Sequence, residues 1–437
     1  MFQLSAKRVW IDGAFRPATL RVQGGRVVHV GPLQVGADRL DDDLVVLPAL
    51  TDTHVHLNEP GRTAWEGFAS GTAAAAVGGV TLLVDMPLNS DPPTTTVVDV
   101  ERKVASATGQ IHVDVGLWGG VIPGNSHEMP AMVQAGVLGF KAFLCPSGID
   151  EFPPCGETDL RIAMNRLRGL GVPLLAHAEL ESELAGNVSD RTYAAYLHSR
   201  PPEWEVRAVA LICALVAETG CRAHIVHLSA AGALDVVAAA KAAGLPVTAE
   251  TCPHYLGLAA EDIPDGATEY KCAPPVRERE NQDLLWAALR NGTLDFVVTD
   301  HSPCLPALKR LENGLFADAW GGIASLQLGL RSVWTEAQKR GVGLADVLRW
   351  MATGPADFIG AADRGRIVAG ATADLVAFAP DRLHRLDPAT LLHKHPTTPW
   401  AGRLLRGELV TTWLRGEVVA ESGRLVGPPT GELFRLR

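Results

Sequence analysis

Short apolar runs recur along the middle of the chain, separated by segments of helical length. Runs of this kind, bounded by turn residues, indicate repeated strand–helix units and a parallel sheet. The segments between them, such as ASGTAAAAVGGV and ALDVVAAAKAAGL, are rich in Ala and Leu and end in Gly, which favours helices capped by Gly. Eight runs predict a (β/α)8 or TIM barrel: LVVLPAL before His54, TLLVDM around Val84, HVDVGLW around Val115, GFKAFL around Lys141, VPLLAHAE around Ala176, AHIVHLS around Val226, PVTAETC around Ala249 and DFVVTDH around Val298.

The two ends of the chain have a different pattern, with short alternating segments such as RVWIDGAF and LVTTWLRGEVVAE separated by turn residues. These segments predict antiparallel strands. Because the N-terminal piece is too short to bury a core alone, we expect one small β-sandwich assembled from both termini. The predicted division is 1–48 and 361–437 for the β-sandwich and 49–360 for the barrel.

Composition and charge narrow the functional classes. The chain has 437 residues, more than the roughly 250 that one barrel needs, with an ordinary 47% hydrophobic and 20% charged residues. A net charge of -10 without a Lys/Arg stripe argues against nucleic-acid binding. The sequence has no apolar stretch of membrane-spanning length, no secretory signal and no CxxC pair among its seven cysteines. We therefore expect a cytoplasmic protein with reduced thiols and no membrane partner.

Metal-capable side chains fall at the ends of the predicted strands. His54 and His56 are two residues apart, so in a strand both imidazoles face the same side. Any one of these residues could instead be packed, and Asp300 could cap a helix. All six together, at the barrel face that carries chemistry, predict a metal centre; they are His54, His56, Lys141, His177, His227 and Asp300.

Lys141 is the unusual member of this set because an ammonium group repels a divalent ion. Burial lowers the pKa of a lysine, and the neutral amine can react with carbon dioxide to give an anionic carbamate. A carbamate has two oxygens and can bridge two divalent ions, leaving a site that polarises a carbonyl. The alternative is a lysine inside the barrel that is paired with a carboxylate.

Ten short motifs, spread over nearly the whole chain, carry a resemblance to a known family. They are HVHLNEPGRTAWEGF, DMPLNSDPPTT, GFKAFLCPSGIDEFP, HAE at His177, YLHSRPPEWE, HIVHLSAAGAL, ETCPHYL, KCAPPVR, VVTDHSPC and WGGIASLQLGL. The HxH and DH pairs are shared by many hydrolases, whereas HLNEPGRT with DMPLNS and FKAFLCPSG is specific. The chain resembles the binuclear metal amidohydrolases of the cyclic amidase branch, and within that branch the allantoinases.

The resemblance implies a cofactor of two divalent ions, Zn²⁺ or alternatively Co²⁺, Mn²⁺ or Fe²⁺, bridged by N6-carboxylated Lys141. It implies His54, His56 and Asp300 on one ion and His177 and His227 on the other, with Lys141 on both. A metal-bridging hydroxide would attack the ring amide, and Asp300 would carry the proton to the departing nitrogen. The resemblance also implies a homo-oligomer, a tetramer.

Substrate choice depends on residues around this centre. Dihydroorotases resemble the chain but usually have Arg in place of Asn58, for a substrate with a carboxylate. Hydantoinases usually have Tyr in place of Pro146. The resemblance therefore implies a neutral cyclic ureide, allantoin, opened to allantoate. The candidates for contacts with its ureido arm are Asn58, Asn89, Ser147 and Ser302, each of which could instead be a turn or cap residue.

Two other functions remain open at this point. One is a hydantoinase, dihydropyrimidinase or dihydroorotase-like cyclic amidase. The other is a non-catalytic scaffold of the dihydropyrimidinase-like type, although such scaffolds usually lack part of the ligand set that is complete here.

Overall fold

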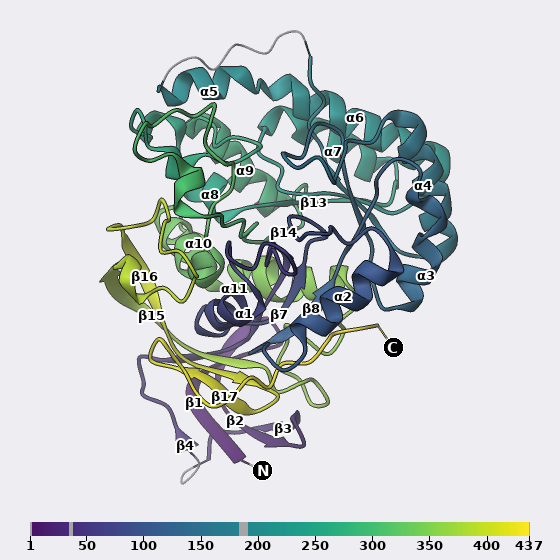
Figure 1. Cartoon of the computed structure of the whole chain (residues 1–437). Helices are drawn as coiled ribbons and strands as arrows, with labels where there is room; N and C mark the ends of the chain where they lie inside the picture. The colour runs from purple at the N-terminus through teal and green to yellow at the C-terminus, as the bar shows by residue number, and fades with distance from the viewer. Residues whose placement is uncertain (1, 35–37, 183–190, 437) are drawn as a thin grey trace.

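The computed structural model describes residues 2–34, 38–182 and 191–436. Parallel strands form its centre, helices surround them, and a separate sheet lies at one end (Figure 1). The parallel strands are β6 (Leu50–Val55), β7 (Val80–Asp85), β8 (Asp114–Leu117), β9 (Gly119–Gly120), β10 (Phe140–Phe143), β11 (Leu174–His177), β12 (Ala223–Ile225), β13 (Val247–Thr251) and β14 (Phe296–Val297). All residues of β6 and β7 are buried, as expected for strands covered on both faces.

These strands belong to two sheets that meet at two junctions, or seams, and so close into a ring. In one sheet β7 pairs with β6 and with β8, and in the other β9 to β14 pair in chain order. β8 and β9 are separated only by Trp118, so they occupy one strand position. At the second seam, Val55 forms a parallel bridge with His301, and the His56 N–H donates to the His301 carbonyl at 2.8 Å. The described strands therefore occupy eight positions, and the predicted (β/α)8 barrel is confirmed.

Helices cover the outside of the barrel, and their ends follow local sequence (Figure 1). Thr96 caps α2 in a reciprocal arrangement with Asp99, and Gly171 follows α4 with a φ of 73°, in the left-handed region that favours glycine. No helix within the described ranges is long and apolar enough to cross a bilayer. The helices are α1 (Phe68–Val77), α2 (Val97–Ala107), α3 (Met129–Gln134), α4 (Glu157–Leu170), α5 (Tyr193–Ser199), α6 (Pro202–Thr219), α7 (Leu234–Ala242), α8 (Pro253–Gly257), α9 (Arg279–Asn291), α10 (Gly329–Lys339), α11 (Leu344–Leu348) and α12 (Gly354–Phe358).

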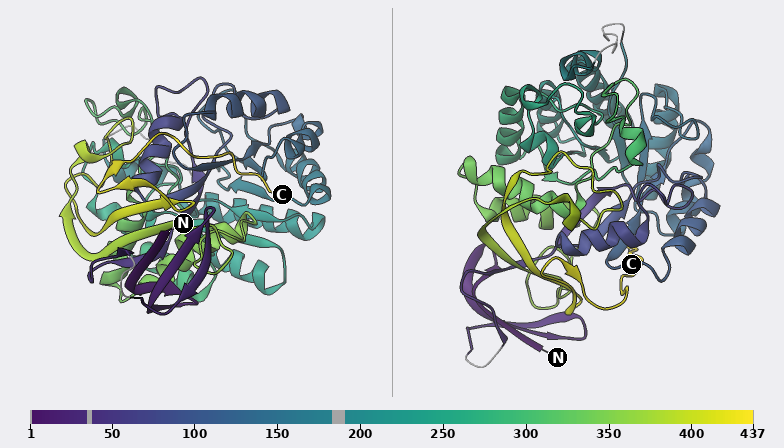
Figure 2. Two further views of the ribbon diagram at one scale, coloured as in Figure 1. Left: turned by 90° about the horizontal axis from the view of Figure 1, so that it is seen from below. Right: turned by 60° about the vertical axis from the view of Figure 1, so that its left-hand side comes forward.

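The two ends of the chain come together, as predicted, and their strands pair in one sheet where a β-sandwich was expected. Its strands follow the order β18-β17-β16-β15-β5-β1-β2-β3, with β4 beside β1. Leu4 and Leu20 share a hydrophobic cluster with Leu375 and Trp413, so both ends of the chain contribute to one small core. Figure 2 shows the purple N-terminal strands beside the yellow C-terminal strands. The strands are β1 (Phe2–Ile11), β2 (Ala14–Gln23), β3 (Arg26–Gly31), β4 (Asp38–Arg39), β5 (Val45–Pro48), β15 (Leu375–Arg385), β16 (Leu404–Leu414), β17 (Glu417–Glu421) and β18 (Arg424–Leu425).

The run LVVLPAL divides between the two sheets, which corrects its assignment to a single barrel strand. Val45–Pro48 is β5, which pairs with β15 and β1 in the terminal sheet. The Ala49 N–H still donates to the Asp374 carbonyl beside β15, whereas the Leu50 N–H donates to Gly79 beside β7. The chain therefore changes sheet between Ala49 and Leu50. As a consequence, His54 lies within the first barrel strand, β6.

Candidate active site

A cavity of about 700 Å³ opens at the carboxyl ends of the barrel strands. Five of the six predicted metal-ligating side chains line it, and the sixth, His54, lies directly behind them with no exposed surface. The five lining side chains are His56, Lys141, His177, His227 and Asp300. The barrel thus brings together residues that lie far apart in the sequence.

The strand ends position these side chains. Lys141 lies within β10, and His177 is the last residue of β11. His227 and Asp300 follow β12 and β14 and have φ angles of 39° and 43°, a conformation that residues with a Cβ seldom adopt. Such strain clusters at functional sites, where the surrounding structure holds the residue in place.

The side chains form two adjacent groups. In the first, Nε2 of His54 lies 3.2 Å from Asp300 Oδ1, and Nε2 of His56 lies 3.6 Å from the same oxygen. In the second, Nδ1 of His177 lies 2.9 Å from Nε2 of His227. Lys141 Nζ is 3.1 Å from His54 Nε2 in the first group, and Lys141 lines the cavity together with His177 and His227 of the second. Lys141 therefore lies where a bridging ligand would be needed.

Three of the four imidazoles hydrogen-bond through their other nitrogen to a buried acceptor. His54 Nδ1 is 2.5 Å from Glu250 Oε1, His56 Nδ1 is 2.5 Å from the Leu88 carbonyl, and His177 Nε2 is 2.8 Å from Glu179 Oε2. Such an acceptor takes the N–H and leaves the facing nitrogen free to bind a metal ion. The donor set therefore fits a metal centre.

Burial sets the protonation states of the site. It lowers the pKa of His54, His56 and His227 well below the usual value, and the Lys141 charge lowers them further. Neutral imidazole is the form that binds a metal ion. Burial also lowers the pKa of Lys141 and raises that of Asp300, although each partner's charge opposes the shift in the other. The lysine is thus closer to the neutral amine than an exposed lysine would be.

The four predicted substrate contacts do not all face the cavity. Asn89, Ser147 and Ser302 line it, but Asn58 is buried outside it and donates to the Pro303 carbonyl at 3.3 Å. The Ser147 hydroxyl lies 2.7 Å from the Phe152 carbonyl and 3.1 Å from that of Ile149, which are contacts within its own loop. For these two residues, the geometry favours the turn interpretation that the sequence had left open.

Sequence reasoning missed three charged residues at the site. Glu250 and Glu179 accept from candidate ligands, and Arg200 lines the cavity and pairs with Glu179. The run HAE gave a signal for Glu179, since an acidic residue two positions after a candidate ligand can contact it, although β11 ends at His177 and Glu179 follows the strand. Arg200 gave no comparable signal, since it lies outside the barrel strands, directly after α5.

Comparison with known proteins agrees with this architecture. A family model for the amidohydrolase family matches residues 45–419. The allantoinase of Streptomyces avermitilis is 48% identical, covering 97% of this chain and 96% of that protein. The allantoinase of Arabidopsis thaliana is 40% identical, covering 99% of this chain and 90% of that protein.

Solved structures show the same fold. The L-hydantoinase (dihydropyrimidinase) of Arthrobacter aurescens superposes with a TM-score of 0.91 at 28% identity, over all of both chains. The dihydropyrimidinase of Brevibacillus agri has a TM-score of 0.89 at 28% identity, covering 99% and 98% of the two chains. Enzymes of this family are metal-dependent, in keeping with the His and Asp cluster of the cavity. The chain therefore belongs to the amidohydrolase family of enzymes and, within it, to the allantoinases among the cyclic amidohydrolases.

Proposed function

We propose that this chain hydrolyses the cyclic amide of allantoin to allantoate, a step of purine (ureide) catabolism. The observation that carries the proposal is the convergence of Lys141, Asp300 and three imidazoles on one cavity at the barrel mouth, with the His54 imidazole directly behind them. The relatives named allantoinase, similar over nearly the whole chain, support the choice of substrate.

The proposed cofactor is a pair of divalent cations, Zn²⁺ first and Co²⁺, Mn²⁺ or Fe²⁺ as alternatives. His54, His56 and Asp300 would hold one ion, His177 and His227 the other, and N6-carboxylated Lys141 both. The contacts of Asp300 with His54 and His56, and of His177 with His227, support this division. The lowered pKa of buried Lys141 favours the neutral amine from which a carbamate forms. When bound, such ions lower the pKa of water and polarise a carbonyl oxygen.

Asp300 is the proposed proton carrier. Its carboxylate faces the cavity, and burial raises its pKa toward neutrality, so it can hold a proton and release it within one turnover. The proton would pass to the ring nitrogen that departs when the amide bond breaks. Asp300 also contacts His54 and His56, which hold its carboxylate at the cavity wall.

The lining of the cavity favours a neutral substrate that forms several hydrogen bonds. Asn89 and Ser302 line the wall, and Pro146 lies where hydantoinases usually have Tyr. Asn58 and Ser147 are proposed to shape the loops that carry these groups, given their contacts within the protein.

A substrate panel tests the proposed function. Metal-replete protein is incubated with allantoin, dihydroorotate, dihydrouracil and hydantoin, and ring opening of each is followed. We expect allantoin to have the highest kcat/KM. A preference for dihydrouracil or hydantoin would establish the alternative, a dihydropyrimidinase or hydantoinase, which the similarity to solved hydantoinases makes the second candidate.

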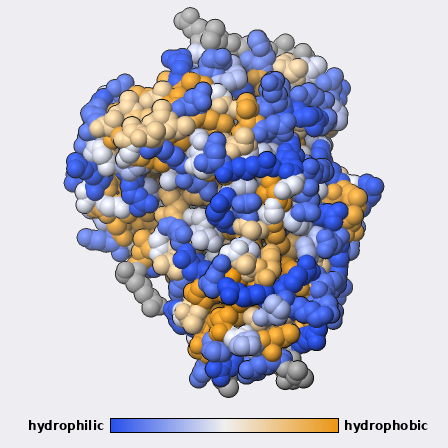
Figure 3. Space-filling view, turned by 180° about the vertical axis from the view of Figure 1, so that it is seen from behind, coloured by the Kyte–Doolittle hydropathy of each residue, from blue (hydrophilic) through white to orange (hydrophobic). Residues whose placement is uncertain are grey.

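We also propose that the chain forms a homo-oligomer, a tetramer. The back of the molecule carries apolar areas among its hydrophilic surface (Figure 3), and exposed apolar patches often mark contacts between proteins. Light scattering of the purified protein measures the assembly directly, and a monomer at micromolar concentration would contradict it.

A further inference from the structure

Arg200 is a cation on the wall of the active-site cavity that the mechanism above does not use. It follows α5, its side chain is 21% exposed, and it lines the cavity together with His177 and Trp204. Its guanidinium lies 5.3 Å from the ring centroid of Trp204, so one face is covered by an aromatic side chain.

Glu179 fixes the orientation of this guanidinium. Nε of Arg200 donates to Glu179 Oε1 at 3.0 Å, and Nη2 donates to the other oxygen. Glu179 has no exposed surface. Two parallel hydrogen bonds to one buried carboxylate hold the planar guanidinium in one geometry.

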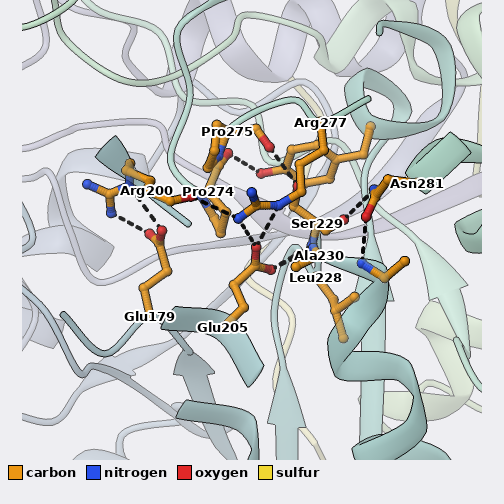
Figure 4. A network of polar contacts seen from close by, with 12 residues as sticks. Glu179, Arg200, Glu205, Leu228, Ser229, Ala230, Pro274, Pro275, Arg277 and Asn281 are labelled. Carbon is orange, nitrogen blue, oxygen red and sulfur yellow. Dashed lines mark hydrogen bonds and ion pairs between the residues drawn. The ribbon is translucent and has the colours of Figure 1, made fainter. Parts of the chain in front are cut away.

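A second ion pair anchors Arg200 from behind (Figure 4). Nη2 of Arg277 donates to the Arg200 carbonyl at 3.2 Å and to Glu205 Oε1 at 2.8 Å. Glu205 Oε2 accepts the N–H groups of Ser229 and Ala230, which follow His227 in the chain. The network thus connects the wall at Arg200 with the loop that carries a candidate metal ligand.

The pairing determines what Arg200 can recognise. A guanidinium has five N–H groups, and the Glu179 pair occupies only its Nε and Nη2 side. Because Glu179 balances the charge, the remaining donors suit a neutral carbonyl oxygen better than a carboxylate. Arg200 and His177 line the same cavity. A ring whose carbonyl reacts beside His177 would therefore lie in the cavity that Arg200 lines, with its arm available to this wall.

Resting on the proposed function, we propose that Arg200 determines specificity by donating a hydrogen bond to the carbonyl oxygen of the ureido arm of the substrate. Lys271, which also lines the cavity, is less suited to this role. Its Nζ donates to the Ala319 carbonyl at 2.6 Å and also lies 3.4 Å from that of Ala317, contacts that bind it to the protein. Lys271 therefore provides a matched control.

The test compares a ligand that has the arm with one that lacks it. In wild type and Arg200→Gln, kcat/KM is measured for allantoin and the inhibition constant for hydantoin, with the metal content of each protein. We expect Arg200→Gln to lower kcat/KM for allantoin by about 100-fold, the scale for loss of a hydrogen bond from a charged group. The inhibition constant of hydantoin should change by less than about threefold, because hydantoin lacks the ureido arm and forms no hydrogen bond with Arg200 that the variant could lose.

Control variants separate recognition from support of the fold. Lys271→Gln should show no selective loss for allantoin, and Arg200→Lys should lie between Arg200→Gln and wild type because it keeps a charge for Glu179. Equal losses for allantoin and hydantoin in Arg200→Gln would overturn the proposal, as would unchanged allantoin kinetics. Failure of wild type to open allantoin would instead contradict the proposed function itself.

Discussion

Oε1 of Glu250 lies 2.5 Å from Nδ1 of His54, although 196 residues separate the two in the chain. The other oxygen of Glu250 lies 3.0 Å from Nε2 of His224, and the carboxylate is almost completely buried. A carboxylate in this position takes the N–H of the imidazole, fixes its ring and increases the basicity of its other nitrogen. In His54, that other nitrogen faces Lys141 and Asp300.

We expect Glu250→Gln to weaken metal binding by about 10- to 100-fold, the usual effect of losing a carboxylate behind a ligating histidine. The amide oxygen can still accept from His54, so the fold should be retained while the basicity of the imidazole falls. Competition with a chelator measures the affinity. Glu203→Gln, at an exposed position of α6, is the control. Equal metal affinity in the Glu250 and Glu203 variants would show that Glu250 does not support the site.

Lys141→Met should lose bound metal and turnover together. Methionine is similar in volume to lysine and suits a buried position, but it has no nitrogen that could carry a carboxylate group. Metal content and allantoin hydrolysis are measured on the same preparations, and the intact mass of wild type is checked for one added carbon dioxide. A Lys141→Met variant with full metal and full activity would exclude the bridging role.

Asp300→Asn should reduce kcat by about 10²- to 10⁴-fold, the range for removal of a general acid–base group. Asparagine has nearly the same shape, so urea unfolding should change little. The pair of measurements distinguishes a proton carrier from a helix cap, because loss of a cap would affect unfolding by about 1 kcal/mol and leave kcat nearly intact.

The barrel was predictable because its strands are apolar runs bounded by turn residues, with Gly-capped helices between them. The boundary at Ala49 was not predictable, because LVVLPAL is one apolar run in the sequence, whichever sheet its parts join. Only the partners decide the division, namely Asp374 for the Ala49 N–H and Gly79 for that of Leu50. Both hydrogen-bond partners lie outside this run in the sequence, so the hydrophobic pattern of the run cannot predict them.

The convergence of six metal-capable residues at one end of the barrel was also foreseeable, since each follows or lies in a barrel strand. Side-chain partners were harder to anticipate. Asn58 and Ser147 have the right chemistry for a substrate contact, yet their hydrogen bonds lie within the protein. Glu179 and Arg200 come from separate segments and meet only in the folded chain. Residue type indicated which side chains could bind a metal ion or a substrate, whereas packing decided which of them face the cavity.

Acid should destabilise the protein through His393, a buried imidazole away from the proposed ligands. Its Nε2 accepts the Gln327 N–H at 3.1 Å, and burial together with the His301 charge lowers its pKa to about 3. An unfolded histidine takes up a proton near pH 6.5, so between these values the unfolded state binds one more proton. The stabilisation is complete above pH 6.5 and is lost as the pH falls toward 3.

The His393 contribution can be isolated with His393→Gln, whose side-chain oxygen can still accept from Gln327. Between pH 4 and 6, the free energy of unfolding of wild type should fall more steeply than that of the variant, by about 1.4 kcal/mol per pH unit for one proton. Urea unfolding at fixed metal load gives both curves, and His29→Gln, at an exposed position of β3, is the control. If the free energies of unfolding of wild type and His393→Gln fell in parallel with pH, His393 would be protonated in the folded protein over this pH range, contrary to the prediction.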